Sequence, residues 1–393
     1  MRYTPREELA QRTLRLQNLL RGKGIDGALI VQNADLFYFA GVVQRAHLFI
    51  PAEGKPLLLV KKSYARAGQE SALENVVPLD NPRELPAALA SHGCGRPACL
   101  GLELDVLPVN EYLRYQKMFP TAKIVDVSPL IRQVRMVKSA YELELLKNAA
   151  ALGREMFSRV REVLREGMTE VELAGQMEAF YRRHGHQGYV RTRSFNMELV
   201  YGHLLAGESC AVPSFLDSPT GGSGLSPSFP QGSGFRAIRR DEPVLIDYVA
   251  VLDGYMVDQA RIFCLGRLPD KLVRAHRVAL EIQQLLKEKG RPGAICSELY
   301  DLAMGVADKN GLAEYFMGYP EPVSFVGHGV GIELDELPVI ARGFPAPLEE
   351  GMVLALEPKF VFPEGAVGVE NTFVVAPQGL ETLTVFEEEI IYL

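Results

Sequence analysis

The sequence has few cysteines, no basic block and no long apolar run. Its five cysteines are scattered through 393 residues without a CxxC pair. An odd, unpatterned set fits reduced thiols and excludes a disulfide framework or a zinc knuckle. No stretch approaches the roughly 18 consecutive apolar residues of a membrane span, and the charged N-terminus has no apolar signal core. We therefore expect a cytoplasmic protein without a membrane partner.

The charge balance argues against a nucleic-acid partner. The chain has 42 Lys and Arg residues against 49 Asp and Glu residues, which gives a net charge of −7. A nucleic-acid binder needs a basic footprint, and no Lys/Arg block provides one. The hydrophobic fraction of 47% and the charged fraction of 23% are typical of a globular protein. At about 150 residues per domain, the length predicts two to three domains.

Residues 1–133 are predicted to form an α/β domain, because helical and strand-like segments alternate along them. Thr4 is predicted to cap the first helix, with Glu7 completing a capping box and Gly22 ending the helix. Three short apolar runs are typical of buried strands: 28–31, 36–40 and 57–60.

Residues 134–393 are predicted to form a second domain of mixed helices and strands. Two capping boxes, Ser139 with Glu142 and Thr169 with Glu172, each begin a predicted helix. The Ser/Pro/Gly-rich segment 213–234 is predicted to be a loop, and a loop this long is usually functional or mobile. Further helices are expected at 270–289 and 294–310. Strands are expected at 323–326, 352–362, 366–376 and 388–392.

Two aspartates interrupt an apolar pair of predicted strands. The Asp253-Gly254 dipeptide between two apolar runs predicts a β-hairpin with a two-residue loop. Counting back from this loop places Asp258 opposite Val249, so Asp247 and Asp258 become diagonal neighbours on one face. Two carboxylates in apolar strands repel each other and lose hydration, so a positive group is expected between them.

Two glutamates and one histidine extend this carboxylate pattern. Glu357 and Glu370 each interrupt a strand-like run, and they share a face if the strands pair through an even number of residues. His328 lies between glycines that leave its imidazole open to a ligand. Four carboxylates and one imidazole would balance two divalent cations, and oxygen donors with one nitrogen suit Mn²⁺, Co²⁺, Fe²⁺ or Zn²⁺. Each residue alone has an ordinary structural explanation, so the signal lies in their joint order.

That order resembles the pita-bread metallopeptidases, the family of methionine aminopeptidase, aminopeptidase P and prolidase. The run from Asp247 to Arg261 is similar to the family pattern DxGxxxxGYxxDxTR, with Ala260 where Thr is usual. GHGVG, LEP and VEN surround the remaining candidates. Five side chains in order resemble the family's metal ligands: Asp247, Asp258, His328, Glu357 and Glu370.

The resemblance implies a fold and a reaction. Residues 1–133 would be an α/β creatinase-like N-terminal domain, and residues 134–393 an α+β pita-bread catalytic domain. The five ligands would hold two divalent metal ions, with Asp258 and Glu370 bridging them and Glu357 acting as general base. The enzyme would be an Xaa-Pro peptidase acting on small peptides. It would be a homodimer in which the N-terminal domain reaches a neighbouring subunit's cleft.

Three positions depart from the peptidase pattern. Asp335 stands where the peptidases carry a second His seven residues after the ligand His. SFPQ at residues 228–231 stands where they carry another His, and Gly368 replaces their Arg. We therefore take Asp335 as a further candidate catalytic residue. His203 and Arg191, in a segment that lines the cleft in the peptidases, are candidate substrate-binding residues.

Three alternatives remain open. A pita-bread enzyme acting on a non-peptide amide or another small molecule, such as a creatinase-like hydrolase or a lyase, is favoured by the replaced His and Arg. Creatinase itself lacks the metal set, so metal content separates that case. A non-catalytic binding protein is the second alternative, and metal ions with a purely structural role are the third.

Overall fold

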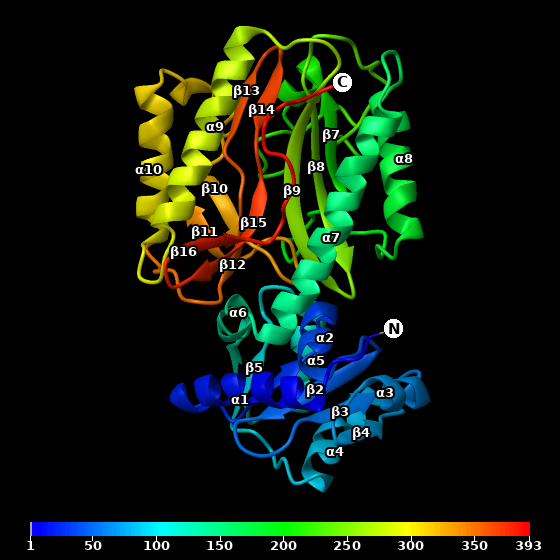
Figure 1. The fold of residues 1–393 in the computed structure, drawn as a ribbon. Coiled ribbons are helices and arrows are strands. Elements are labelled where there is room, and N and C mark those ends of the chain that lie inside the picture. The colour runs from blue at the N-terminus through cyan, green and yellow to red at the C-terminus, as the bar shows by residue number, and fades with distance from the viewer. Residues whose placement is uncertain (1) are drawn as a thin grey trace. The chain divides into compact units, whose positions relative to one another are not determined.

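The computed structural model describes residues 2–393, and the chain forms two compact units, Met1–Arg135 and Met136–Leu393. Figure 1 shows the elements of each unit. The expected domain boundary between residues 133 and 134 stays a prediction.

The first unit has a six-stranded mixed sheet in the order β4-β3-β2-β1-β5-β6. The strands are β1 (Gly27–Ile30), β2 (Ala46–Pro51), β3 (Leu57–Val60), β4 (Asn75–Pro78), β5 (Cys99–Leu102) and β6 (Lys123–Asp126). The helices are α1 (Arg6–Gly22), α2 (Asn33–Ala40), α3 (Tyr64–Glu70), the 3₁₀ helix η1 (Pro82–Glu84), α4 (Leu85–Ser91), α5 (Val109–Met118) and α6 (Ser128–Met136).

Two sequence predictions in this unit are wrong. Residues 36–40, predicted as a strand, lie in α2, because the Gln32 side chain caps that helix and Gly41 ends it in a left-handed conformation. The predicted capping box at the first helix does not form. Pro5 occupies the N-cap position with an extended backbone, and no side chain caps α1. Thr4 is buried instead.

The second unit contains three sheets with strand orders β11-β10-β12-β15-β16, β13-β14 and β17-β9-β8-β7. Its helices are α7 (Ala140–Val163), α8 (Glu170–Arg183), α9 (Asp270–Lys289) and α10 (Cys296–Lys309), with 3₁₀ turns η2 (Gly207–Ala211) and η3 (Ala313–Tyr315). The first strands are β7 (Gly202–Ala206), β8 (Val244–Leu252), β9 (Tyr255–Cys264), β10 (Phe325–Gly329) and β11 (Glu336–Ala341). The later strands are β12 (Val353–Leu356), β13 (Lys359–Phe362), β14 (Gly365–Gly368), β15 (Asn371–Ala376), β16 (Gly379–Thr382) and β17 (Ile391–Tyr392).

Most of the predicted organisation of the second unit is confirmed. Both capping boxes form, at the starts of α7 and α8, and the described residues 213–234 contain no helix or strand. The long strands predicted at 352–362 and 366–376 are each broken in two, because β12 and β15 pair in one sheet while β13 and β14 form another. The breaks fall at Glu357 and Glu370, two of the candidate ligands.

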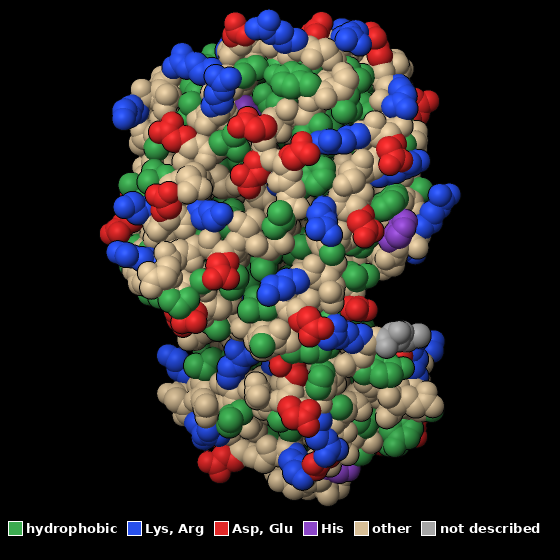
Figure 2. All heavy atoms as spheres, in the orientation of Figure 1, with side chains coloured by type: hydrophobic (Ala, Val, Ile, Leu, Met, Phe, Trp, Pro, Cys, Tyr) green, Lys and Arg blue, Asp and Glu red, His purple; other side chains and the backbone are tan. Residues whose placement is uncertain are grey.

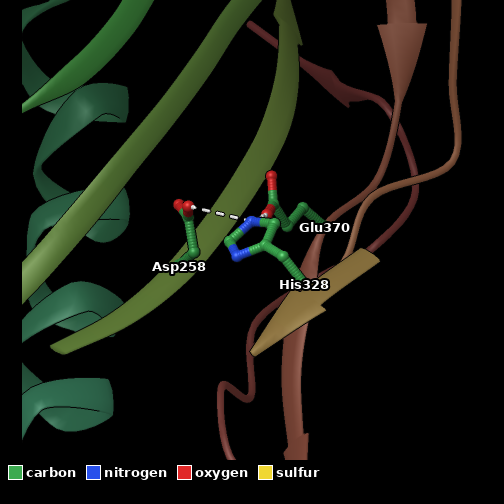
Figure 3. A group of neighbouring side chains, drawn as sticks. All are labelled: Asp258, His328 and Glu370. Carbon is green, nitrogen blue, oxygen red and sulfur yellow. Dashed lines mark ion pairs between the residues drawn. The ribbon is translucent and has the colours of Figure 1, made fainter. Parts of the chain in front are cut away.

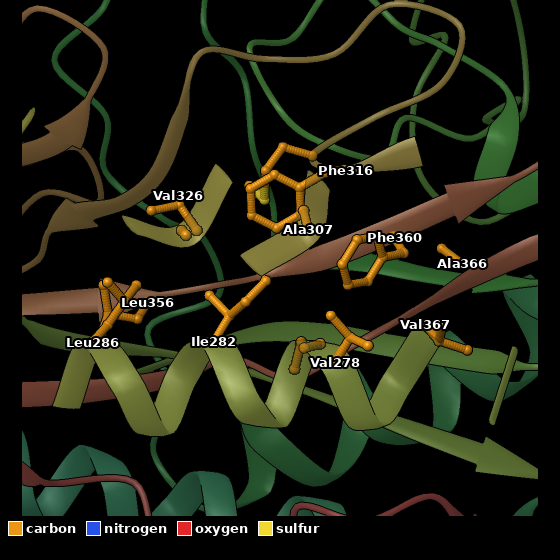
Figure 4. Packing of buried hydrophobic residues seen from close by; sticks show 14 of the residues in the cluster. Val278, Ile282, Leu286, Ala307, Phe316, Val326, Leu356, Phe360, Ala366 and Val367 are labelled. Carbon is orange, nitrogen blue, oxygen red and sulfur yellow. The ribbon is translucent and has the colours of Figure 1, made fainter. Parts of the chain in front are cut away.

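Helices cover the sheets and enclose the core. α7 packs on β8 and β9, whereas α9 packs on β13, β14 and β16 (Figure 1). Val278, Ile282 and Leu286 project from one face of α9 toward Leu356 and Phe360 (Figure 4). Burying each such side chain contributes about 1.5–3 kcal/mol to stability. This core supports the strands that carry the candidate site.

Among residues 2–393, no helix is both long enough and apolar enough to cross a membrane. Figure 2 shows Lys and Arg side chains interspersed with Asp and Glu side chains over the visible face.

Candidate metal centre

The predicted hairpin places two of the candidate carboxylates together. β8 and β9 pair with Val249 opposite Asp258, so Asp247 and Asp258 are diagonal neighbours, as predicted. Asp253 and Gly254 both have positive φ angles, 50° and 84°. This conformation matches a two-residue turn of the type that favours Asp-Gly, because glycine adopts such angles without steric cost.

The two glutamates converge from the strand breaks. Phe362 pairs with Gly365 across a two-residue connection, which is the even spacing that lets Glu357 and Glu370 share a face. Glu357 Oε2 and Glu370 Oε2 lie 2.6 and 2.8 Å from Lys359 Nζ. Asp247 Oδ2 lies 2.8 Å from the same ammonium nitrogen. Lys359 therefore joins three of the four candidate carboxylates.

Sequence reasoning missed Lys359, although a signal was present. Lys359 is two residues after Glu357, and side chains at this spacing in an extended chain lie on one face. It was also the one basic residue in the strand-like run MVLALEPKFVF. Burial alone would lower the pKa of Lys359, but the three carboxylates outweigh burial and hold that pKa well above its usual value. The positive group expected between the carboxylates is thus supplied, in part, by the chain itself.

A second group of donors surrounds His328 (Figure 3). His328 Nε2 lies 4.0 Å from Asp258 Oδ2, 3.9 Å from Glu370 Oε1 and 3.7 Å from Glu357 Oε1. His328 Nδ1 lies 3.1 Å from the carbonyl oxygen of Leu334, which can only accept, so Nδ1 carries the proton in this bond. In the neutral imidazole, Nε2 then presents its lone pair to the carboxylates, as a metal-binding histidine does.

The carboxylate oxygens that face His328 are buried and have few hydrogen-bond partners. Glu370 Oε1 has no hydrogen-bond partner, although Glu370 is 1% exposed. Asp258 Oδ1 accepts from the Gln259 backbone, which leaves Oδ2 facing His328. Burial, followed by repulsion from Asp247, raises the pKa of Asp258 to about 7. Burial also raises the pKa of Glu370 well above its usual value. Both shifts indicate a site with too much negative charge for its surroundings, which a bound cation relieves.

The pKa of His328 responds to the same carboxylates. Burial alone would lower it, but Asp335, Glu357 and Asp258 outweigh that effect and raise it. A cation bound at Nε2 competes with a proton for the same lone pair, so metal binding here would release a proton.

The predicted substrate residues are not all near this group. His203 and Asp335 line a cavity of about 70 Å³ together with all five candidate ligands. His203, on β7, lies opposite Asp247, and burial lowers the pKa of its imidazole. Asp335 Oδ1 lies 3.6 Å from His328 Nδ1. Arg191 does not line this cavity, and its Nε donates to the Tyr189 hydroxyl instead.

A larger cavity of about 590 Å³ adjoins the smaller one. The two share residues 216–218 and Phe325 as lining. Part of the long loop 213–234 therefore forms walls of both cavities. Gln231, from the stretch where the peptidases carry a histidine, lies with its Oε1 3.4 Å from His203 Nε2.

Two groups of side chains offer donor atoms for a divalent metal ion. Asp258, His328 and Glu370 offer ligand atoms within 4.8 Å of one another, as do Asp247, Glu357 and Glu370. The first group has the composition that divalent transition metals prefer, and its Glu370 Oε1 has no partner. The first group therefore fits an ion. In the second group, Lys359 Nζ already contacts all three carboxylates.

Comparison with known proteins agrees with this fold. The model of metallopeptidase family M24 matches residues 144–377, and that of the creatinase/prolidase N-terminal domain matches residues 12–137. A Xaa-Pro dipeptidase of Pyrococcus horikoshii is 26% identical over 373 residues, covering 93% of this chain and 95% of the relative. A Xaa-Pro dipeptidase of Lactobacillus helveticus is 27% identical over 387 residues, covering 96% of this chain and 97% of the relative.

Solved structures share the fold along the whole chain. A Xaa-Pro dipeptidase from Bacillus anthracis has a TM-score of 0.83 at 23% identity, covering 98% of this chain and all of that one. The prolidase from Pyrococcus horikoshii has a TM-score of 0.81 at 24% identity, covering 97% of this chain and all of that one.

The fold is the pita-bread fold of metal-dependent hydrolases, preceded by a creatinase-type domain, as predicted. The chain belongs to metallopeptidase family M24. Members of this family use divalent metal ions, generally two.

Proposed function

We propose that the protein is a metal-dependent hydrolase that cleaves the N-terminal bond of small peptides, with Xaa-Pro peptides as the leading substrate class. The observation that carries this proposal is the buried group in which His328 Nε2 faces three carboxylate oxygens at 3.7–4.0 Å. The Xaa-Pro dipeptidases among the relatives support the substrate class.

A divalent ion held by Asp258, His328 and Glu370 would polarise a carbonyl and make a bound water acidic enough to react near neutral pH. Glu357 would accept a proton from that water. Its Oε2 is held by Lys359 at 2.6 Å, which leaves Oε1 directed toward the His328 side. A fixed acceptor beside the reacting water is the arrangement that general base catalysis requires.

The cavities fit a small, extended substrate. The cavity of about 70 Å³ at the ligands has room for the reacting end only. The adjoining cavity of about 590 Å³ provides room for the remainder. Asp335 is a partly exposed carboxylate beside the ligands and can accept hydrogen bonds from a substrate amine. Both ring nitrogens of His203 already have partners, Thr220 Oγ1 and Gln231 Oε1, so His203 would contact a substrate through the face of its ring.

A non-peptide amide is the second candidate substrate class. It is favoured because Gln231 and Gly368 occupy positions where the peptidases carry His and Arg. Neither an amide nor a glycine provides the charge that anchors a peptide's terminal carboxylate.

One hydrolysis panel separates the candidates. Metal-stripped protein would be refilled with Mn²⁺ or Co²⁺ and offered Xaa-Pro dipeptides, longer Xaa-Pro peptides, peptides without proline, and creatine. Asp258→Asn protein serves as the blank. Cleavage confined to Xaa-Pro bonds supports the proposal, and cleavage of creatine alone supports the second candidate. No turnover of any substrate by metal-loaded protein would contradict the proposal.

The metal identity and the cytoplasmic location stay predictions from the residues, and the homodimer stays a prediction that rests on the family resemblance. The same protein would be examined for mass in solution by light scattering, where we expect a dimer.

A further inference from the structure

The four carboxylates, three of them buried, divide their oxygens between two places. One place, the lysine position, is surrounded by Asp247 Oδ2, Glu357 Oε2 and Glu370 Oε2. The other, the histidine position, is surrounded by His328 Nε2 with Asp258 Oδ2, Glu357 Oε1 and Glu370 Oε1. Glu357 and Glu370 each present one oxygen to each position. The site is therefore built for two neighbouring cations that share two carboxylates.

Lys359 Nζ fills the lysine position completely. An ammonium group has three N–H donors and no acceptor. The three carboxylate oxygens at 2.6–2.8 Å account for all three donors. A divalent transition metal would have to lie at about 2.0–2.2 Å from the same oxygens, so it cannot occupy this place together with Nζ.

The backbone opposite Lys359 approaches it closely, and the nearest atom to a Cβ built at Gly368 would be the Pro358 carbonyl oxygen at 2.5 Å. Gly368 pairs with Lys359 across the β13–β14 ladder. A Cβ atom at Gly368 would lie 2.8 Å from Lys359 Cγ and 2.7 Å from its Cα, closer than real Cβ atoms approach. Lys359 itself is 1% exposed, so its ammonium is buried in this position.

The histidine position, in contrast, has no internal cation. Glu370 Oε1 is buried without a hydrogen-bond partner there. Four carboxylates and one ammonium leave three net negative charges, which one divalent ion reduces to one. Two ions added to the lysine would instead leave excess positive charge in a buried site.

We infer that the Lys359 ammonium permanently occupies one of the two cation positions, and that the chain binds a single divalent ion at the histidine position. This inference concerns the site of the proposed function and rests on its being a metal site. It disagrees with the two ions expected from the sequence. Lys359 is then a positioning residue: its donors are all used on carboxylates, and it fixes the oxygens of Glu357 and Glu370 that face the metal ion.

Metal counting tests this inference without any activity measurement. Chelator-stripped protein would be loaded with excess Mn²⁺, desalted and analysed for bound metal. We expect one ion per chain, with an electron paramagnetic resonance spectrum of uncoupled Mn²⁺. Lys359→Gly should bind two ions, with a coupled spectrum, because the variant frees three carboxylate oxygens. Two ions in the unaltered protein, or none, would overturn the inference.

A matched pair of aspartate variants tests the division of the site even if Lys359→Gly fails to fold. Asp247 faces only the lysine position, whereas Asp258 faces the histidine position. By calorimetric titration, Asp258→Asn should weaken Mn²⁺ binding about 100-fold or more, whereas Asp247→Asn should weaken it less than about 10-fold. Equal losses in the two variants would contradict the inference. Peptide cleavage is measured separately, so one bound ion without cleavage would contradict the proposed function and leave this inference intact.

Discussion

Glu357 and Glu370 each offer one oxygen to Lys359 and one toward His328, and this division gives the two residues different tasks. Glu370 is the more deeply buried of the two residues. Its Oε1 has no hydrogen-bond partner, so this oxygen is available to a bound ion. Both residues line the small cavity, where the Glu357 oxygen directed toward His328 can meet a substrate water. The same pair of residues therefore provides a metal ligand and a base.

At the residue scale, Glu357→Gln should remove the base while preserving the shape of the site. Because general base catalysis contributes about 10²–10⁴-fold, kcat should fall by that factor. The measurement is steady-state cleavage of the best substrate from the panel, with circular dichroism to verify the fold. Glu364→Gln, at the exposed turn between β13 and β14, is the matched control and should keep full activity. Undiminished turnover in Glu357→Gln would rule out this role.

At the scale of elements, the β8–β9 hairpin sets the spacing of Asp247 and Asp258 through its turn. Gly254 has a φ of 84°, a left-handed conformation that costs a residue with a side chain about 1–2 kcal/mol. Gly254→Ala should therefore lower the free energy of unfolding by about that amount in urea titrations. Gly305→Ala, in the exposed middle of α10, should raise it by about 0.5–1 kcal/mol. A stabilising effect of Gly254→Ala would contradict the turn geometry.

The hairpin also shows what the sequence could predict. Asp-Gly between apolar runs gives the turn, and the turn then gives the register, so Asp258 opposite Val249 followed from local chemistry alone. The capping boxes at Ser139 and Thr169 were equally local. The helix at 33–40 was missed because its apolar run has no helical period, and its cap is a glutamine rather than a usual capping residue.

The sequence predicted which residues form the site but not how these residues are arranged in space. The order of five candidate ligands gave their identity, but the sequence could not show that Lys359 lies among them, because that depends on how β13 enters a separate sheet. Likewise, Arg191 and His203 appeared equivalent along the chain. Only the tertiary fold brings His203 opposite Asp247 and directs Arg191 to Tyr189.

At the scale of the whole molecule, buried histidines should make stability depend on pH. Burial lowers the pKa values of His47, His186 and His276 to about 4. Between pH 6.5 and about 4, these histidines bind protons in the unfolded chain but not in the folded chain. Their contribution to stability is therefore present above pH 6.5 and is lost as the pH falls.

His276 allows this dependence to be measured. Its Nε2 donates to the Glu388 carbonyl, and a glutamine can keep that bond without titrating. A fully expressed shift at this residue corresponds to about 3 kcal/mol. Urea unfolding of metal-stripped protein should therefore lose less stability between pH 7 and pH 5 in His276→Gln than in the unaltered chain. The exposed His92→Gln serves as control and should keep the original slope, and an unchanged slope in His276→Gln would contradict this assignment.

The stability of the first unit should depend on one buried ion pair close to its C-terminal end. Arg135 NH1 donates to Asp35 Oδ1 at 2.7 Å, and both side chains are buried within the first unit. Removing one partner of a buried pair costs about 3–5 kcal/mol. A fragment of residues 2–137 should thus unfold cooperatively, and a fragment of residues 2–133 should be less stable by about that amount. Arg135→Met in the longer fragment should reproduce the loss, and equal stability of all three would contradict this boundary.

The central claim is that one metal ion and Lys359 share the carboxylate site. Anomalous diffraction from crystals of Mn²⁺-loaded protein, collected at the manganese absorption edge, tests it most directly. The account predicts one anomalous peak per chain, bonded to His328 Nε2, with Lys359 Nζ among Asp247, Glu357 and Glu370. Two peaks with the Lys359 side chain turned away, or no peak beside His328, would contradict it.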